Sequence, residues 1–481
     1  MALEVARAYG DREAVVDGPI RLRHDALAQH AVAAAGRLRE LGVAPGDRVA
    51  ILLPNGWEYV AGYLGIQLAG AVAVPVNTRF TASEIEHVLA DSGSQIVLTN
   101  APLVKGAVDV GEIVAAPSRE VDLDTLDPSV LPGLLRRGDD VAQLLYTSGT
   151  TGKPKGAMQT HVNVLFNAVS VRSQAGAAPG ERTLIAAPLF HATGLVSQLV
   201  GFLAAGGCCV LMPAFRAEGA LRLLVEERIT VFAGVAAMLR LMLTVDAPDL
   251  PALRLFVMGG APVPETFPAE MAVRMPKLVL GNVWGLTEAT SMVTYTDAGD
   301  YLARPWSVGR AVPGVEIGIS LDGGPPADLR DVAGELCIRG PIVTAGYWGN
   351  PEATAASYVD GWLHTGDVGS IDADGYVRVL DRLKDMIIRG GENIYSLEVE
   401  NALSAHPDVA EVAVVGVPDP IFDERVRAVV VPRPGSSPTV ASVREHAATV
   451  LADFKVPAEV RFVVELPRNP SGKVLKRDLA R

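Results

Sequence analysis

Helical and strand patterns alternate at short spacing along the first four-fifths of this 481-residue chain. The helical patterns cover residues 24–41, 57–68 and 217–227, and the strand patterns cover 48–53, 71–76, 230–234 and 253–258. Gly42 is expected to stop the first helix, because glycine commonly ends helices. Strand–helix–strand order at this spacing predicts parallel sheets covered by helices.

The pattern of expected secondary structure changes after about residue 305. From 305 to 380, short β segments are separated by Gly, Pro and Asp, which predicts a barrel-like or distorted sheet. From residue 385 the patterns predict a compact α+β unit with helices at 397–405 and 440–451 and strands at 411–416, 425–431 and 460–464. We therefore expect an α/β fold with a large N-terminal domain, residues 1–383, and a small C-terminal domain, residues 384–481.

The net charge and the positions of the cysteines limit the functions that this protein can have. The formal net charge is −13, whereas a general nucleic-acid binder needs an excess of positive charge. No nucleic-acid partner is therefore expected. Cys208, Cys209 and Cys337 show no metal-ligand spacing, and the first two lie in an apolar run typical of inert buried thiols. The first residues show no secretory signal pattern. Together these features predict a soluble protein of a reducing compartment, the cytoplasm.

Residues 192–215 carry no charged side chain, and this run is long enough to span a bilayer. Gly206 and Gly207 divide the run, and the short second half before Pro213 resembles a strand. A buried helix, a turn and a buried strand therefore fit better than a membrane span.

Residues 146–156, Tyr-Thr-Ser-Gly-Thr-Thr-Gly-Lys-Pro-Lys-Gly, carry the most specific chemistry. Glycines let the backbone approach a ligand closely, while hydroxyl and ammonium groups add donors, an array that suits a polyphosphate. The spacing excludes an ordinary P-loop, because only Thr150 and Thr151 separate Gly149 from Gly152, and Pro154 follows Lys153. A flexible, solvated linker is the alternative interpretation.

Further motifs follow the glycine-rich loop in a fixed order, at 188–194, 256–262, 281–288, 334–336, 364–367, 381–385, 389–394 and 469–473. Among them are Pro-Leu-Phe-His-Ala-Thr-Gly, Trp-Gly-Leu-Thr-Glu, His-Thr-Gly-Asp and Asn-Pro-Ser-Gly-Lys. The ordered set resembles the adenylate-forming superfamily, in its acyl-CoA synthetase branch, over nearly the whole chain. The resemblance implies a ligase that uses ATP to convert a carboxylic acid into acyl-AMP and then into a CoA thioester.

The same resemblance implies the ligands of each site residue. ATP, Mg²⁺ and coenzyme A as co-substrate would be bound. The phosphates would contact Thr147, Ser148, Gly149, Thr150, Thr151 and Lys155, with Thr287 at the α-phosphate and Glu288 on magnesium. The adenine slot would comprise Gly259, Gly260, Ala261, Asn282, Val283 and Trp284. Asp367 would accept the ribose hydroxyls, assisted by Arg382.

The resemblance also implies that Lys473 is the catalytic residue. A turn-forming Asn-Pro-Ser-Gly sequence places its ammonium at a projecting tip. In the family this lysine bridges the substrate carboxylate and the α-phosphate. The alternative is a solvated tail lysine, as is expected of Lys476 three residues on.

Two histidines invite a functional interpretation. The family places His191 beside the acyl and pantetheine pockets, which implies positioning rather than proton transfer; a satisfied core histidine is the alternative. His364 is expected to hold the loop that carries Asp367.

The family also implies domain motion. The small, mobile domain would rotate about the residue that matches Lys384. It would present Lys473 for adenylation, and then Arg389, Gly390 and Gly391 for thioester formation.

The chain departs from the family near the expected acyl pocket. It has Gly234-Val235-Ala236-Ala237 where the family commonly shows Gly-Val-Pro-Thr, and Trp284 where Tyr is usual. The small apolar side chains next to Met238 favour a hydrophobic acid, fatty or aromatic, over an amino or dicarboxylic acid.

Three function classes remain open. The first is an acid–CoA ligase, and the second is a stand-alone adenylating enzyme that loads a phosphopantetheine carrier protein. The chain ends at Arg481 without a carrier domain, which favours the first class. The third is a membrane fatty-acid transporter with incidental ligase activity, which depends only on residues 192–215. A homodimer is also left open.

Overall fold

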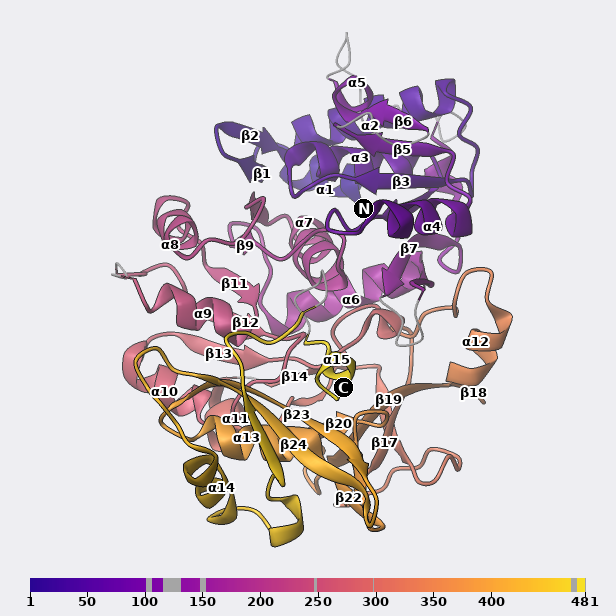
Figure 1. The fold of residues 1–481 in the computed structure, drawn as a ribbon. Coiled ribbons are helices and arrows are strands. Elements are labelled where there is room, and N and C mark those ends of the chain that lie inside the picture. The colour runs from indigo at the N-terminus through magenta and orange to yellow at the C-terminus, as the bar shows by residue number, and fades with distance from the viewer. Residues whose placement is uncertain are drawn as a thin grey trace.

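Two mostly parallel sheets with flanking helices make up the N-terminal part of the chain (Figure 1). The structure, a computed structural model, describes residues 1–100, 106–115, 131–147, 153–245, 249–296, 298–468 and 474–480. The first sheet has the order β6 (Ala107–Asp109), β5 (Ile96–Thr99), β3 (Arg48–Leu52), β4 (Val72–Pro75), β7 (Val141–Thr147) and β8 (Lys155–Thr160). Only β8 runs antiparallel to its neighbour in this sheet.

The second sheet has seven strands and contributes the loops of the candidate site. Its order is β13 (Val279–Asn282), β12 (Leu255–Met258), β11 (Val231–Gly234), β9 (Arg182–Ile185), β10 (Cys208–Leu211), β1 (Glu13–Asp17) and β2 (Ile20–Arg23). Only β2 is antiparallel in this sheet. The parallel sheets and the helices that cover them confirm the α/β fold expected from the alternating patterns.

Helices flank these sheets, and their ends follow the local sequence. The helices are α1 (Ala2–Tyr9), α2 (His24–Glu40), α3 (Trp57–Leu68), α4 (Ala82–Ser92), α5 (Val110–Val114), α6 (His161–Gln174), α7 (Gly201–Ala204), α8 (Ala217–Glu226), α9 (Ala236–Met242), α10 (Phe267–Arg274) and α11 (Ala298–Ala303). Thr81 and Glu84 form a reciprocal capping box at the start of α4. Gly42 follows α2 with a φ of +88°, in agreement with its predicted role as a helix stop.

The apolar run 192–215 folds as a π-helix, Thr193–Val200, continued by α7 and followed by the buried strand β10. The prediction of a buried helix, a turn and a strand is thus confirmed. Across the described part of the chain, no helix has both the length and the apolar character needed to cross a bilayer.

An antiparallel sheet occupies the region of short β segments. It contains β16 (Glu316–Ser320), β17 (Gly334–Arg339), β18 (Tyr358–Val359), β19 (Trp362–Ile371) and β20 (Val377–Arg382), with α12 (Pro351–Ser357) before β18. Register shifts interrupt the pairing of β19 with both β17 and β20, which makes the sheet distorted, as predicted. Short elements precede it: the 3₁₀ turns η1 (Pro132–Leu135) and η3 (Thr287–Ala289), and the strand pair β14 (Thr294–Tyr295) and β15 (Arg310–Ala311).

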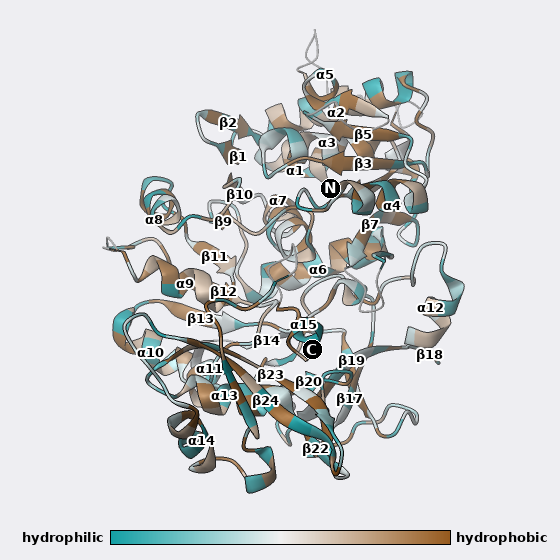
Figure 2. Ribbon diagram, in the orientation of Figure 1, coloured by the Kyte–Doolittle hydropathy of each residue, from teal (hydrophilic) through white to brown (hydrophobic). Residues whose placement is uncertain are grey.

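The C-terminal part has its own sheet and its own apolar cluster. The sheet comprises β21 (Ile387–Arg389), β22 (Glu392–Ile394), β23 (Val409–Asp419), β24 (Asp423–Pro432) and β25 (Glu459–Phe462), beside α13 (Ser396–Ser404), α14 (Val440–Ala448), the 3₁₀ turn η4 (Asp453–Lys455) and α15 (Lys476–Leu479). Val399 and Leu403 of α13 pack with Val414 and Val430 in that cluster. Figure 2 shows β3 and β5, which are central strands of the first sheet, as largely hydrophobic.

Candidate active site

The carboxyl ends of β11, β12 and β13 lie at one edge of the second sheet. The parallel register sets Gly234, Met258 and Asn282 level with one another, so the loops that follow all leave from this edge. In open α/β sheets, ligands bind outside the carboxyl ends of the strands. A Cβ built on Gly259 would lie 2.4 Å from Val283 Cγ2, so glycine is needed where these two loops meet.

The predicted adenine-slot residues share this edge. Gly260 has a φ of +78°, and Gly260 and Ala261 are both exposed. Asn282 is buried and donates its Nδ2 to the Ser307 carbonyl at 3.1 Å, so its side chain braces the edge. The backbone N–H of Val283 donates to the Met258 carbonyl at 2.8 Å.

The glycine-rich loop connects two antiparallel strands, β7 and β8. Thr147 at the end of β7 is paired with Lys155 at the start of β8. The predicted phosphate ligands Ser148, Gly149, Thr150 and Thr151 lie outside the described residues. Strand β8 lies close to η3, because Gln159 of β8 donates to the Thr287 carbonyl at 3.0 Å.

Tyr347 lies between the predicted magnesium ligand and a predicted phosphate ligand. Its hydroxyl donates to Glu288 Oε1 at 2.8 Å, and the Lys155 ammonium lies 5.1 Å from the centre of its ring. The main chain at Tyr347 forms an antiparallel bridge with Ala157, which holds the ring beside β8. Glu288 and Lys155 are therefore brought to the same tyrosine, which lies between their charges.

Asp367 is buried, and its two carboxylate oxygens each have a different partner. Trp284 Nε1 donates to Oδ2 at 2.9 Å, and Arg382 Nε lies 2.8 Å from Oδ1. Arg382 also donates to the Thr365 carbonyl at 3.1 Å. Arg382, which was expected to assist in ribose binding, thus pairs with Asp367 itself. Trp284, which departs from the family pattern, contributes its indole N–H to this carboxylate.

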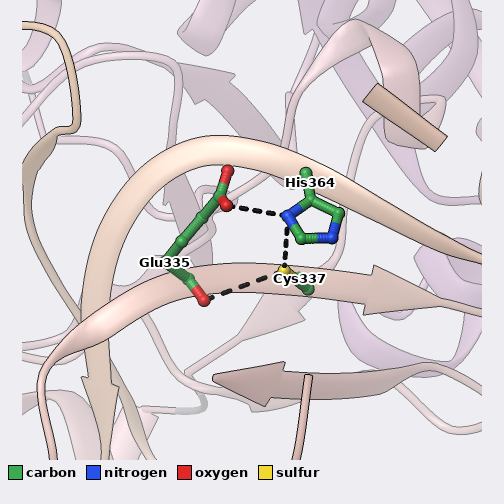
Figure 3. A group of neighbouring side chains, drawn as sticks. All are labelled: Glu335, Cys337 and His364. Carbon is green, nitrogen blue, oxygen red and sulfur yellow. Dashed lines mark hydrogen bonds and ion pairs between the residues drawn. The ribbon is translucent and has the colours of Figure 1, made fainter. Parts of the chain in front are cut away.

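Glu335 supports the turn that carries Asp367. Figure 3 shows its side chain beside those of His364 and Cys337. Its two oxygens accept from His364 Nδ1 at 2.8 Å and from the Gly366 N–H at 2.9 Å. His364 was expected to help hold this loop, and its hydrogen-bond partner there is Glu335.

Cys337 completes this cluster, with Sγ 3.5 Å from His364 Nδ1. Burial raises the pKa of the Cys337 thiol to about 12, so the thiol stays protonated. Carboxylate, thiol and imidazole groups also bind metals, but a 2.8 Å separation between Glu335 and His364 is that of a hydrogen bond. We therefore interpret the cluster as a hydrogen-bonded support.

A cavity of about 150 Å³ opens beside Thr147 and Thr287. Its lining comprises Pro75 of β4, Asn77 and Phe80 after β4, Tyr146 and Thr147 of β7, Phe190 and His191 after β9, and Thr287 of η3. Burial lowers the pKa of His191 to about 4, so the imidazole is neutral at neutral pH. The cavity thus combines aromatic rings with neutral donors next to the predicted phosphate site.

Asn77 is a cavity residue that the sequence analysis missed. Its Oδ1 accepts the Arg79 N–H at 2.9 Å, which fixes the orientation of the amide. Its buried Nδ2 has no hydrogen-bond partner among the described residues. A buried donor without a partner is uncommon and marks a place where a ligand atom could bind. The Asn-Thr-Arg sequence after an apolar strand was the available signal.

The predicted residues of the small domain are only partly described. Lys384 is half-exposed and lies 3.6 Å from Asp385. Arg389 donates to the Phe454 carbonyl at 2.7 Å, and Gly390 and Gly391 form the β21–β22 turn with φ values of +59° and +87°. Lys473 lies outside the described residues.

The expectation of a solvated Lys476 is wrong. Its side chain is only 21 % exposed and lies 2.7 Å from Glu400. This pairing has no local signal in the sequence, because Glu400 lies on a different element, α13.

Tyr347, Glu335 and Gln159 were missed for a common reason. Each acts on a site residue that is distant in sequence: Tyr347 on Glu288, Glu335 on His364 and Gly366, and Gln159 on the backbone of Thr287. Glu335 lies within one of the ordered motifs, at 334–336, which was its only signal.

Comparison with known proteins identifies the family of this chain. The family described as "AMP-binding enzyme" matches residues 3–348, and "AMP-binding enzyme C-terminal domain" matches residues 398–473. "Feruloyl-CoA synthase" of Amycolatopsis sp is 41% identical over 99% of this chain and 97% of its own length. "Fatty acid--[acyl-carrier-protein] ligase ScoC" of Streptomyces coeruleorubidus is 37% identical over 95% of this chain and 91% of its own length.

A solved structure extends the similarity to three dimensions. The o-succinylbenzoate CoA synthetase of Bacillus subtilis, in complex with ATP and magnesium ion, superposes with a TM-score of 0.89 at 32% identity, over 99% of this chain and 98% of that one. Its complex with the acyl-adenylate intermediate gives the same TM-score over 100% and 97%. From the matched family and these relatives, we conclude that this chain belongs to the AMP-binding enzyme family, within the adenylate-forming superfamily that its ordered motifs resemble.

Proposed function

We propose that this protein is an ATP-dependent acid–CoA ligase that acts on a hydrophobic carboxylic acid. In the first half-reaction the acid's carboxylate oxygen attacks the α-phosphorus of ATP, so acyl-AMP forms and pyrophosphate leaves. In the second, the CoA thiol attacks the acyl carbon, AMP leaves and the thiol proton is released. The observation that carries this proposal lies in the segment after β13, in a chain 41% identical to a feruloyl-CoA synthase. This segment carries both Glu288, which is joined to Lys155 through Tyr347, and Trp284, which is joined to Asp367.

The first half-reaction needs positive groups where phosphate charge accumulates. Lys155 and the hydroxyl-rich loop provide donors for the β- and γ-phosphates, from Thr147, Ser148, Gly149, Thr150 and Thr151. Thr287, on the facing 3₁₀ turn, would contact the α-phosphate.

Glu288 fits a magnesium ligand. Tyr347 occupies one acceptor position of this carboxylate, which offers about four lone-pair sites to hydrogens or to a hard cation. Magnesium bound there would neutralise phosphate charge, while Tyr347 holds the carboxylate in place.

Nucleoside binding is assigned to the sheet edge and to Asp367. Gly259, Gly260 and Ala261 with residues 282–284 would bind adenine, because both loops leave the same edge. Asp367, oriented by Trp284 and Arg382, would accept from the ribose hydroxyls.

Substrate class follows from the neighbouring strand. Val235, Ala236 and Met238 leave β11 at the same edge as the proposed adenine slot, and none carries a charge. Phe190 and Phe80 line the cavity beside His191. An apolar acyl group fits such walls better than an ammonium or a second carboxylate does.

The two half-reactions are proposed to use different faces of the small domain. Lys473 would bridge the carboxylate and the α-phosphate during adenylation. Rotation at Lys384, the proposed boundary between domains 1–383 and 384–481, would then bring Arg389, Gly390 and Gly391 to the site for thioester formation. The separate apolar cluster around α13 supports this division.

A panel of free acids tests the substrate proposal. With ATP, magnesium and CoA, pyrophosphate release should be fastest for aromatic or fatty acids and slowest for amino and dicarboxylic acids. A preference for a charged or amino acid would refute it.

A second function is favoured by one comparison. The 37% identity to a fatty acid–[acyl-carrier-protein] ligase makes a phosphopantetheinylated carrier an alternative thiol acceptor. Parallel assays with free CoA and with holo carrier protein separate the two: acyl-CoA formed at the higher kcat/KM supports the ligase, and faster carrier loading supports the alternative.

A further inference from the structure

Two carboxylates on different elements are linked to one ammonium group near the end of the chain. Lys476 Nζ lies 2.7 Å from Glu400 Oε1 and donates to Ser396 Oγ at 2.6 Å. The Ser396 hydroxyl in turn donates to Asp381 Oδ1 at 3.0 Å. The network therefore runs from the tail helix α15, through α13, to the end of β20.

Backbone N–H groups also donate hydrogen bonds to both carboxylates, those of Glu400 and Asp381. Val414 donates its N–H to Glu400 at 2.8 Å, while Asp381 accepts the N–H of Ser396 and, at 2.8 Å, that of Arg382. Burial raises the pKa of Asp381 and that of Glu400, and the Lys476 ammonium opposes both shifts. Removing Lys476 would leave two poorly solvated carboxylates without that charge, which is a large perturbation.

The network crosses the proposed hinge. Asp381 precedes Lys384, whereas Ser396, Glu400 and Lys476 follow it. Rotation about Lys384 would therefore change the position of Asp381 relative to the other three. The arrangement that contains the link superposes over nearly the full chain on a relative bound to ATP and magnesium.

We propose that Lys476 is a positioning residue for the adenylation half-reaction. By joining Glu400 to Ser396 and Asp381, it fastens the tail helix α15 to the strand before the hinge. This inference rests on the proposed function, in which Lys473, three residues earlier, serves adenylation alone. Thioester formation, which uses another face of the small domain, does not need the link.

The test compares the two half-reactions in Lys476→Met, whose side chain keeps length and loses charge. Acid-dependent ATP–pyrophosphate exchange should fall between about 10- and 100-fold, as expected for misplacement of a reacting group by about an ångström. Thioester formation from supplied acyl-AMP and CoA should stay within about twofold, since the chemistry of that step depends on orientation of the thiol.

Matched variants separate positioning from general stability. Arg477→Met removes the next cation of the same helix, which is 67 % exposed, and should leave both half-reactions within about twofold. Asp381→Asn weakens the link from the other side of the hinge and should reproduce the selective loss of exchange. The double variant Lys476→Met/Asp381→Asn should be no worse than the more severe single variant, because both remove one connection.

Several results would overturn the inference. Equal loss of both half-reactions would show that Lys476 only stabilises the fold. Unchanged exchange in Lys476→Met, with exchange abolished in Lys473→Ala, would refute the positioning role and leave the proposed function standing. Exchange that survives Lys473→Ala would instead refute the proposed role of that lysine, and the inference with it. If Lys476→Met does not fold, Asp381→Asn alone decides between selective and equal loss.

Discussion

Trp284 illustrates how one residue can adapt a shared site. Its indole N–H donates to Asp367, 83 residues away in the sequence, while Arg382 binds the other oxygen of that carboxylate. The departure from tyrosine at this position was visible in the sequence. Its consequence was not, because it depends on how β13 and β19 meet in the folded chain.

We predict that Trp284→Phe weakens nucleotide binding. Loss of a hydrogen bond to a charged group costs about 1.5–3 kcal/mol, so KM for ATP should rise about tenfold or more while KM for the acid changes little. Trp362→Phe, whose ring instead lies over Arg339, is the control and should leave KM for ATP unchanged. Equal increases in both KM values would contradict the assignment of Asp367 to the ribose.

His191 predicts a pH dependence of stability. Its folded pKa of about 4 lies below the usual 6.5, so below pH 6.5 the unfolded chain binds the proton more readily than the folded protein does. Stability is therefore lost as pH falls from about 6.5 toward 4, by up to about 1.4 kcal/mol per pH unit.

Thermal unfolding of the wild type and of His191→Gln at pH 7.5 and pH 5 checks this effect. The variant lacks the titrating group, so the wild-type Tm minus the variant Tm should become smaller at pH 5. A difference that is constant between the two pH values would contradict the neutral, buried state of His191.

At the scale of elements, the sequence predicted more of the regular structure than of the supports around the site. The helix over 57–68 was predicted with the boundaries that the structure has, because its apolar pattern and flanking glycine are local signals. The run 192–215 was predicted as helix, turn and strand, but not as a π-helix, whose hydrogen-bond pattern has no comparable local signal. Glu335 on β17 supports β19 through a pairing that only the sheet register creates.

We predict that Glu335→Gln disturbs this support. The carboxylate accepts from both His364 and Gly366, whereas an amide offers one acceptor oxygen and presents its N–H₂ to the second donor. An unsatisfied buried donor costs about 1–3 kcal/mol, so Tm should fall and KM for ATP should rise.

Glu316→Gln is the matched control for this variant, since its carboxylate is 61 % exposed and pairs with Arg339 at the surface. Surface pairs of this kind contribute about 0–1 kcal/mol. If the two glutamine variants bind ATP equally well, Glu335 does not position the turn that carries Asp367.

At the scale of the whole molecule, the order of motifs along the chain predicted the family. The fold places Lys155 and Glu288 on either side of Tyr347, and Asp367 beside Trp284, which no local pattern shows. The cross-hinge link at Lys476 could not be predicted, because it joins β20, α13 and α15.

Lys473→Ala is predicted to separate the two half-reactions. Loss of its ammonium should abolish acid-dependent ATP–pyrophosphate exchange, because nothing else is assigned to bridge the two anionic reactants. Thioester formation from supplied acyl-AMP should remain substantially intact. Equal loss of both activities would contradict the assignment of Lys473 to adenylation alone.

The central claim is that ATP is cleaved between its α- and β-phosphates to activate a hydrophobic acid. The most direct test is to identify the products of purified protein incubated with ATP, magnesium, CoA and an active acid. We predict AMP, pyrophosphate and acyl-CoA in equal amounts, with none formed when the acid is omitted. Formation of ADP and orthophosphate in place of AMP would contradict the account.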